Sequence, residues 1–262
     1  MDEHQTIIYG KNVVLEACRA NRKIYEMLIS EETYKKEGIF RKYIKDREIS
    51  HQIISNKQFK QVAHQKYNLA GQLQGVIAKV VAYEYLELEA LINHLSKQSK
   101  PAFLLMLDGL EDVHNLGAIM RTAESAGVDA IIIGKHASVG LNGTVARLSV
   151  GAVEYVPVVQ VTNLNRATEK LKAAGIWFVG AEAENSEHYR SIDMKMPVCL
   201  VVGSEGRGIS RLMKEACDFK VHIPMVGKIT SLNASVAAAL LLYEVHHQRH
   251  PVQEIQGGKF ND

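Results

Sequence analysis

Nearly continuous apolar runs recur along residues 102–224, and segments with helical periodicity separate most of them. Runs of this kind are typical of parallel strands that are buried on both faces. Helical spacing is found near 115–126, 142–149, 163–174 and 208–216, and again from about 231 to 247. The pattern predicts an α/β fold in which helices cover a Rossmann-like parallel sheet. The runs are AFLLML, DAIII, VEYVPVV, IWFVGA, PVCLVVG and FKVHIP.

A weaker pattern of short helices and strands occupies the first 80 residues, which indicates a small separate α/β unit. We expect helices around 11–20, 39–46 and 57–64, and strands around 24–30, 51–55 and 75–80. Residues 82–102 have the spacing of an amphipathic helix that runs into a polar link ending at Pro101. The expected division is a domain at 1–81, a linker at 82–101, a domain at 102–250 and a disordered tail at 251–262.

Charge is distributed unevenly along the chain, although the net charge is only +2. Residues 1–80 hold 14 Lys/Arg against 9 Asp/Glu, whereas the rest hold 17 against 20. Basic clusters such as Arg22–Lys23, Lys35–Lys36 and Arg41–Lys42 are interpreted as solvated helix faces, with phosphate binding as the alternative.

Cysteine usage and hydropathy bear on the compartment. Three cysteines without a C-x-x-C pair argue against a disulfide framework and a thiolate zinc site, and favour a reducing cytoplasm. The opening lacks an apolar signal-peptide core, and the run at 236–243 is much shorter than the roughly 20 residues of a membrane span. We therefore expect no membrane association.

The first of three motifs, NLGAIMRTAESAG at 115–127, follows an apolar run and has helical spacing. Asn115 stands where a helix N-cap is expected, and Arg121 lies off the apolar stripe. Taken alone, these residues predict a cap and a surface arginine.

The second motif, LVVGSEGRGIS at 200–210, is a strand followed by a glycine-rich turn. Gly203, Gly206 and Gly208 allow a tight turn that brings backbone N–H groups close to a ligand. The spacing G-x-x-G-x-G differs from the dinucleotide fingerprint, and Glu205 is unfavourable for a phosphate.

The third motif is IPMVGKITSLNASVAAALLLYE at 223–244. GKIT resembles the end of a P-loop, but the glycine required five positions before Gly227 is replaced by His222, so we reject an NTPase. Ser231 and Asn233 are cap-type residues that precede a helix rich in Leu and small residues.

Together and in this order, the three motifs resemble those of the SpoU (TrmH) family of RNA ribose 2′-O-methyltransferases, within the SPOUT class. The resemblance implies a deep C-terminal trefoil knot and S-adenosylmethionine as cofactor. It implies catalytic roles for one set of five residues and cofactor contacts for a second set of five. Ser231 belongs to both sets. The catalytic residues are Asn115, Arg121, Glu205, Ser231 and Asn233; the cofactor-binding residues are Gly203, Ile223, Met225, Ser231 and Leu232.

The resemblance extends to the N-terminal part, where YGKNVVLEA and GVIA match the family's substrate-binding domain, which is similar to a ribosomal-protein RNA-binding fold. The chain departs from several relatives at Leu73, where they carry histidine. The two-domain layout implies a guanosine of 23S ribosomal RNA as target. The alternatives are a tRNA, or a ribosomal adenosine whose methylation gives antibiotic resistance. A homodimer is also implied.

A ribose hydroxyl is a poor nucleophile, so transfer requires in-line positioning and stabilisation of developing negative charge. Because arginine has a very high pKa, we expect Arg121 to stabilise an alkoxide and grip a phosphate rather than to act as a base. His114 is a lower-ranked base. No metal is required.

A non-catalytic RNA-binding factor remains an alternative function. An oxidoreductase is disfavoured because the chain lacks the dinucleotide fingerprint.

Overall fold

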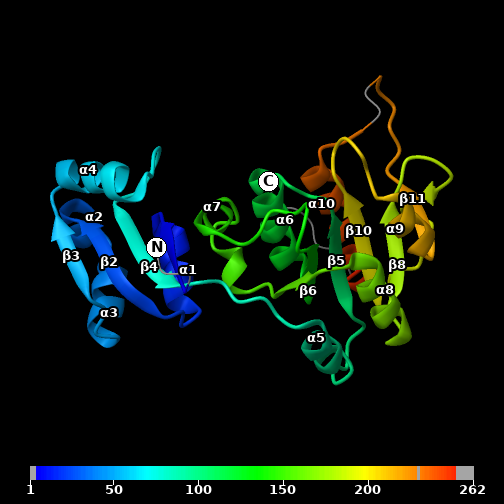
Figure 1. Ribbon diagram of the computed structural model, residues 1–262, viewed down its shortest axis with the longest axis horizontal. Coiled ribbons are helices and arrows are strands. Elements are labelled where there is room, and N and C mark those ends of the chain that lie inside the picture. Colours follow the sequence, from blue (N-terminus) through cyan, green and yellow to red (C-terminus); the bar gives the residue numbers. More distant parts are fainter. Residues whose placement is uncertain (1–3, 229–230, 252–262) are drawn as a thin grey trace, which may run out of the picture.

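The computed structural model describes residues 4–228 and 231–251, so nearly all of the expected tail lies outside the described residues. The described residues form two sheets, each with its own helices, which lie side by side along the long axis of the molecule (Figure 1). The first sheet is built from the N-terminal strands, and the second belongs to the part of the chain that carries the three motifs.

The N-terminal sheet has four strands in the order β1-β4-β2-β3. β4 pairs antiparallel with β1 and β2, and β3 pairs parallel with β2. The elements are β1 (Gln5–Tyr9), α1 (Lys11–Arg19), β2 (Ile24–Ser30), α2 (Glu31–Lys36), α3 (Gly38–Asp46), β3 (His51–Ile54), α4 (Asn56–Tyr67) and β4 (Val76–Val81). The predicted helices and strands are confirmed here, but β1 and α2 were not predicted. α2 has the polar sequence EETYKK and is started by the Ser30 side chain, which accepts from Thr33 N.

The second sheet has seven strands in the order β7-β6-β5-β10-β8-β11-β9, and every pair is parallel. This confirms the predicted α/β fold with a parallel sheet. The strands are β5 (Phe103–Asp108), β6 (Ala130–Gly134), β7 (Val158–Val161), β8 (Trp177–Ala181), β9 (Glu187–His188), β10 (Val198–Gly203) and β11 (Phe219–His222).

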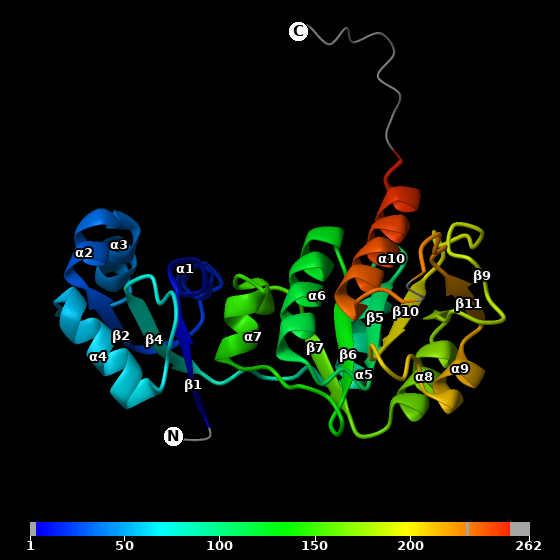
Figure 2. The same ribbon diagram turned by 90° about the horizontal axis from the view of Figure 1, so that it is seen from above.

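Helices cover both faces of this sheet (Figure 2). α6 and α10 pack with the strand side chains Phe103, Leu105 and Leu107, whereas α5, α8 and α9 pack with Leu104 and Met106. The opposite orientation of successive strand residues explains the two cores. The helices are α5 (Leu88–Leu95), α6 (Val113–Ala126), α7 (Gly143–Leu148), α8 (Leu164–Ala173), α9 (Arg211–Ala216) and α10 (Ala234–Arg249).

Two predicted segments differ in the structure. The run VEYVPVV is not one strand, because Ala152–Glu154 forms a 3-10 helix, η1, and only Val158–Val161 is β7. Pro157 lies between them and has no N–H for a strand ladder. The amphipathic helix predicted at the start of the 82–102 segment also begins later than expected. Leu86 pairs with Val159 in an isolated bridge, so only Leu88–Leu95 is helical.

A buried ion pair joins the N-terminal unit to η1 of the second unit. Arg22 Nη1 donates to Glu154 Oε1 at 2.6 Å, and both side chains are only 6% exposed. The guanidinium also lies 3.5 Å from the centre of the Tyr83 ring and donates twice to the Val81 carbonyl. Burial raises the pKa of Glu154 even though Arg22 opposes the shift. For Arg22, the solvated helix face and the phosphate contact are therefore both wrong, because its side chain is buried in this ion pair.

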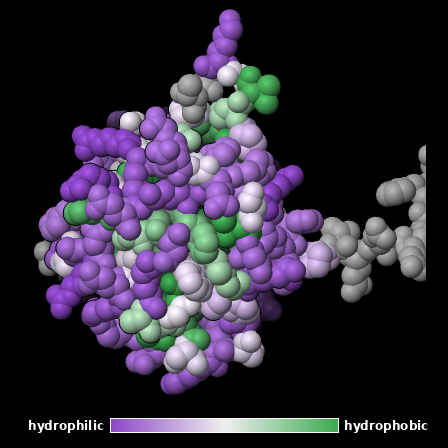
Figure 3. All heavy atoms as spheres, turned by 90° about the vertical axis from the view of Figure 1, so that its right-hand side faces the viewer, coloured by the Kyte–Doolittle hydropathy of each residue, from purple (hydrophilic) through white to green (hydrophobic). Residues whose placement is uncertain are grey.

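The end of the molecule that carries β8, β11 and β9 is mainly hydrophilic, with smaller apolar areas between polar side chains (Figure 3). Among the described residues, no helix combines the length and the hydropathy needed to cross a membrane.

Candidate active site

The pairing of β5 with β10 brings the first two motifs together. The register places Gly203 beside Asp108, so both strands end at the same edge of the sheet. α6 begins shortly after β5, and the glycine-rich turn follows β10 directly. In open α/β sheets this carboxyl edge is where ligands bind.

Three side chains from the three motifs meet at this edge. Asn115 Nδ2 donates to Glu205 Oε1 at 2.8 Å, and Asn233 Nδ2 donates to Asn115 Oδ1 at 2.9 Å. Asn233 Nδ2 also donates to the same Glu205 oxygen. Asn115 is buried, at 6% exposure, and its amide is bonded at both ends. We call Asn115, Glu205 and Asn233 the polar triad.

The position of Asn115 corrects one prediction. The N-cap of α6 is Asp112, whose carboxylate accepts from His114 N at 2.8 Å. The helix starts at Val113, so Asn115 is its third residue and does not cap. Its side chain is therefore free to join the triad. His114 is exposed beside it.

Asn233 is the N-cap of α10, as its residue type predicted. Its Oδ1 accepts from Ser235 N at 2.9 Å and Val236 N at 3.4 Å, which satisfies donors at the helix start. Its Nδ2 is left for Asn115 and Glu205. One amide thus starts the helix and completes the triad.

The glycine-rich turn is held closed by close backbone approach. Gly208 has φ +63° and its N–H donates to the Ser204 carbonyl at 2.8 Å. A Cβ on Gly203 would lie 2.0 Å from the Gly208 carbonyl, so only glycine fits there. Asp108 Oδ2 accepts from Ser210 N at 2.7 Å and anchors the far end of the turn. Sequence reasoning missed Asp108. Its signal was a carboxylate at the end of a buried strand.

A cavity of about 540 Å³ lies between this turn and the segment that joins β5 to α6. Asn115 and Glu205 line it, and the other charged residues in its wall are mostly acidic. These are Asp108, Glu111, Asp112 and Arg207. Such a wall favours a cationic ligand over a phosphate.

Other predicted site residues do not line this cavity. Arg121 is exposed on α6, six residues after Asn115, which is about 9 Å along the axis and on another face. Ile223 and Leu232 are half-buried, Met225 is 40% exposed and Ser231 is exposed, and none of these four lines the cavity. Residues 229–230, part of the rejected P-loop pattern, lie outside the described residues.

Comparison with protein families gives two matches. Residues 102–243 match the SpoU rRNA Methylase family, and residues 7–86 match the family described as RNA 2′-O ribose methyltransferase substrate binding. Together they contain the first two motifs, all but the last residue of the third, and the N-terminal sheet apart from the first two residues of β1.

Individual proteins are similar to this chain over nearly its whole length. A Bacillus subtilis protein named as a TrmH family tRNA/rRNA methyltransferase is 46% identical over 97% of this chain and 100% of its own length. The SpoU methyltransferase AviRb from Streptomyces viridochromogenes, solved with AdoMet, has a TM-score of 0.78 at 22% identity, covering 94% of this chain and 91% of that one. An AdoMet-bound rRNA methyltransferase from Sinorhizobium meliloti has a TM-score of 0.77 at 23% identity, covering 95% and 89%.

Proposed function

Because this chain belongs to the SpoU (TrmH) family of S-adenosylmethionine-dependent RNA methyltransferases, we propose that it methylates a ribose 2′-hydroxyl in 23S ribosomal RNA, at a guanosine. The polar triad carries the proposal. It joins one residue from each motif at the carboxyl edge of the sheet, where a ligand can reach it.

The residues at this edge fit the cofactor. S-adenosylmethionine carries a sulfonium cation, and the cavity wall offers Glu205 and further carboxylates. When bound, the cofactor supplies an electrophilic methyl group. Gly203 would leave room for close backbone approach, while Ile223, Met225, Ser231 and Leu232 would hold the adenosine and methionine parts. A C-terminal knot that brings these segments together is part of the proposal.

In this mechanism the triad orients the ribose and Arg121 supplies positive charge. Asn115 and Asn233 are fixed by their bonds to Glu205, so little reorganisation is needed when the hydroxyl arrives. Arg121 would stabilise the developing alkoxide and bind the neighbouring phosphate, and Ser231 would face the reacting centre. No metal takes part.

The substrate assignment is supported by the N-terminal sheet, its excess of basic residues and its family match. We propose that residues 1–81 bind RNA, 82–101 link the domains and 102–250 form the catalytic domain, in the cytoplasm. A tRNA target and a ribosomal adenosine are the competing substrates, because the relatives are named for both RNA classes.

The test is transfer of labelled methyl from S-adenosylmethionine to unmodified 23S rRNA and unmodified tRNA, with the methylated ribose mapped. We expect label at one rRNA guanosine, and a loss of at least about 100-fold with Arg121→Ala, of the size found when a charge-stabilising group is removed. Cofactor binding should survive that change. Label in tRNA would overturn the assignment of 23S rRNA as the substrate. Normal turnover by Arg121→Ala would remove Arg121 from the mechanism.

We also propose that the protein is a homodimer. Val236, Leu240 and Tyr243 are 46%, 41% and 49% exposed and follow one another at helical spacing on α10. Such a stripe is typical of an interface. In such a dimer, the exposed Arg121 of one copy would reach the cavity of the other copy.

A further inference from the structure

A second cavity, of about 850 Å³, lies in the N-terminal sheet unit and is larger than the one at the polar triad. It lies among the start of α1, one face of α4 and the loop between α4 and β4. We call residues 68–75 the α4–β4 loop. No residue of the catalytic mechanism lines this cavity.

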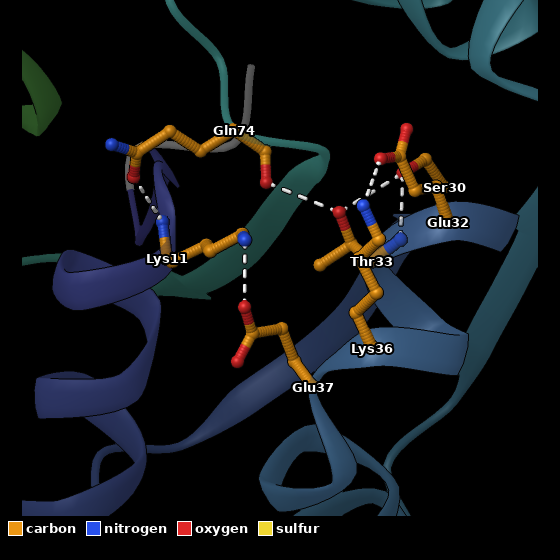
Figure 4. A network of polar contacts seen from close by, with 7 residues as sticks. All are labelled: Lys11, Ser30, Glu32, Thr33, Lys36, Glu37 and Gln74. Atoms are coloured by element: carbon orange, nitrogen blue, oxygen red, sulfur yellow. Dashed lines mark hydrogen bonds and ion pairs between the residues drawn. The ribbon is translucent and has the colours of Figure 1, made fainter.

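Glu32, the acidic residue of its lining, and the nearby Glu37 each pair with a lysine (Figure 4). Lys11 Nζ lies 2.7 Å from Glu37 Oε1, and Lys36 Nζ lies 2.7 Å from Glu32 Oε1. Asn56 donates to the second oxygen of Glu32. Carboxylates bound in this way repel a polyanion less than free ones do.

The α4–β4 loop is held in a conformation that side chains rarely adopt. Gln74 has φ +54°, between the glycines Gly71 at +85° and Gly75 at +72°. The Gln74 Oε1 accepts from Lys11 N at 2.8 Å, and its carbonyl accepts from Thr33 Oγ1 at 3.3 Å (Figure 4). A Cβ on Gly75 would lie 2.1 Å from Thr33 Oγ1. Strain kept by such contacts is typical of a preformed binding loop.

Several polar groups of the lining are uncommitted. In the part of the chain that the structure describes, the side chains of Lys60, His64 and Gln72 and the Nε2 of Gln74 make no hydrogen bond or ion pair. Phe59 and Leu73 form a buried apolar floor. The cavity therefore combines an apolar floor, amide groups, an imidazole and a cation.

We propose that this cavity binds an unpaired nucleobase of the RNA substrate, with Lys60 on the adjacent phosphate. Amides and an imidazole recognise the edge of a base, and the apolar floor receives its face. A paired base hides that edge, which is why RNA sequence is read mostly in loops and bulges. The inference rests on the proposed function, since it takes RNA as the substrate.

The test compares two fluorescent RNA probes with equal numbers of phosphates: a hairpin with a randomised single-stranded loop, and a blunt duplex. Binding to the full chain is measured by anisotropy. We expect a preference for the hairpin, and a hairpin-specific loss of about fivefold in His64→Ala/Gln72→Ala, as for one or two lost hydrogen bonds. The matched control is Gln61→Ala/Gln65→Ala, which changes exposed residues of α4 outside the lining.

Equal losses on both probes, no loss, or a wild type without preference would overturn the proposal. All four substituted side chains are exposed, so folding should be retained, and the thermal midpoint checks this. Methyl transfer is measured separately. A chain that prefers the hairpin through this cavity but transfers no methyl group would overturn the proposed function and leave this inference standing.

Discussion

Asn233 has two tasks that only an asparagine performs at once. Its oxygen accepts from the first turn of α10, and its nitrogen donates to Asn115 and Glu205. Serine offers the cap without the second donor, and aspartate offers the cap with a charge. The residue type is therefore set by the triad as well as by the helix.

We expect Asn233→Asp to be destabilising in a way that depends on pH. The new carboxylate faces Glu205, and two like charges raise the pKa of the pair in the folded state. Since the folded chain then holds more protons than the unfolded one, stability is lost as pH rises from about 4 upward. The loss in the free energy of unfolding relative to wild type should grow to about 1–2 kcal/mol by pH 8. It is no larger because the site is partly exposed.

Thermal unfolding of wild type and variant across about pH 4–8 measures this effect, a range chosen to span the expected titration. Asn233→Ser is the matched control: it keeps an acceptor for the cap but adds no charge, so its deficit should be the same at each pH. A parallel pH dependence for both variants would show that the triad is not formed in solution.

The triad also shows what the sequence could not predict. The resemblance identified Asn115, Glu205 and Asn233, but their bonds span 28, 90 and 118 residues. Periodicity describes only neighbours along the chain, so it placed Asn115 at a cap. The tertiary pairing of β5 with β10 decides which side chains meet.

At the scale of elements, apolar pattern predicted most of the strands and helices. It worked where a strand is buried on both faces, as in β5, β6 and β10. It failed for α2, which has a polar sequence, and for η1, whose apolar residues pack in a helical turn. Burial against the rest of the molecule determines whether such short segments form a helix or a strand. A short stretch of sequence carries no information about that burial.

The junction between η1 and the N-terminal sheet gives an element-scale prediction. Arg22→Met leaves the Glu154 carboxylate buried without its partner, so we expect a loss of about 3–5 kcal/mol in the free energy of unfolding. Adding Glu154→Gln should restore much of it. Urea unfolding at neutral pH measures both variants.

The control for this prediction is Arg19→Met. Arg19 pairs with Glu16 at 2.6 Å, but its side chain is 53% exposed, so the loss should stay below about 1 kcal/mol. Similar losses for Arg19→Met and Arg22→Met would mean that the junction does not hold the two sheets together.

At the scale of the whole molecule, one chain does not place all the proposed catalytic residues at one point. Arg121 lies on a face of α6 away from Asn115, and it is exposed. α6 packs against α10, whose exposed stripe is the proposed interface. In a two-fold dimer the same surface is used by both copies, so each Arg121 would act in the partner's cavity.

Mixing two inactive variants tests this arrangement. Arg121→Ala and Asn115→Ala should each be inactive alone. In randomly mixed dimers, half the molecules are mixed and each of these has one intact site, so about a quarter of the wild-type rate should return. Introducing Leu240→Glu into both chains should disrupt the apolar stripe and abolish the recovery. If the mixture stays inactive while sedimentation shows mixed dimers, Arg121 acts within its own chain, since a mixed dimer would then contain two defective sites.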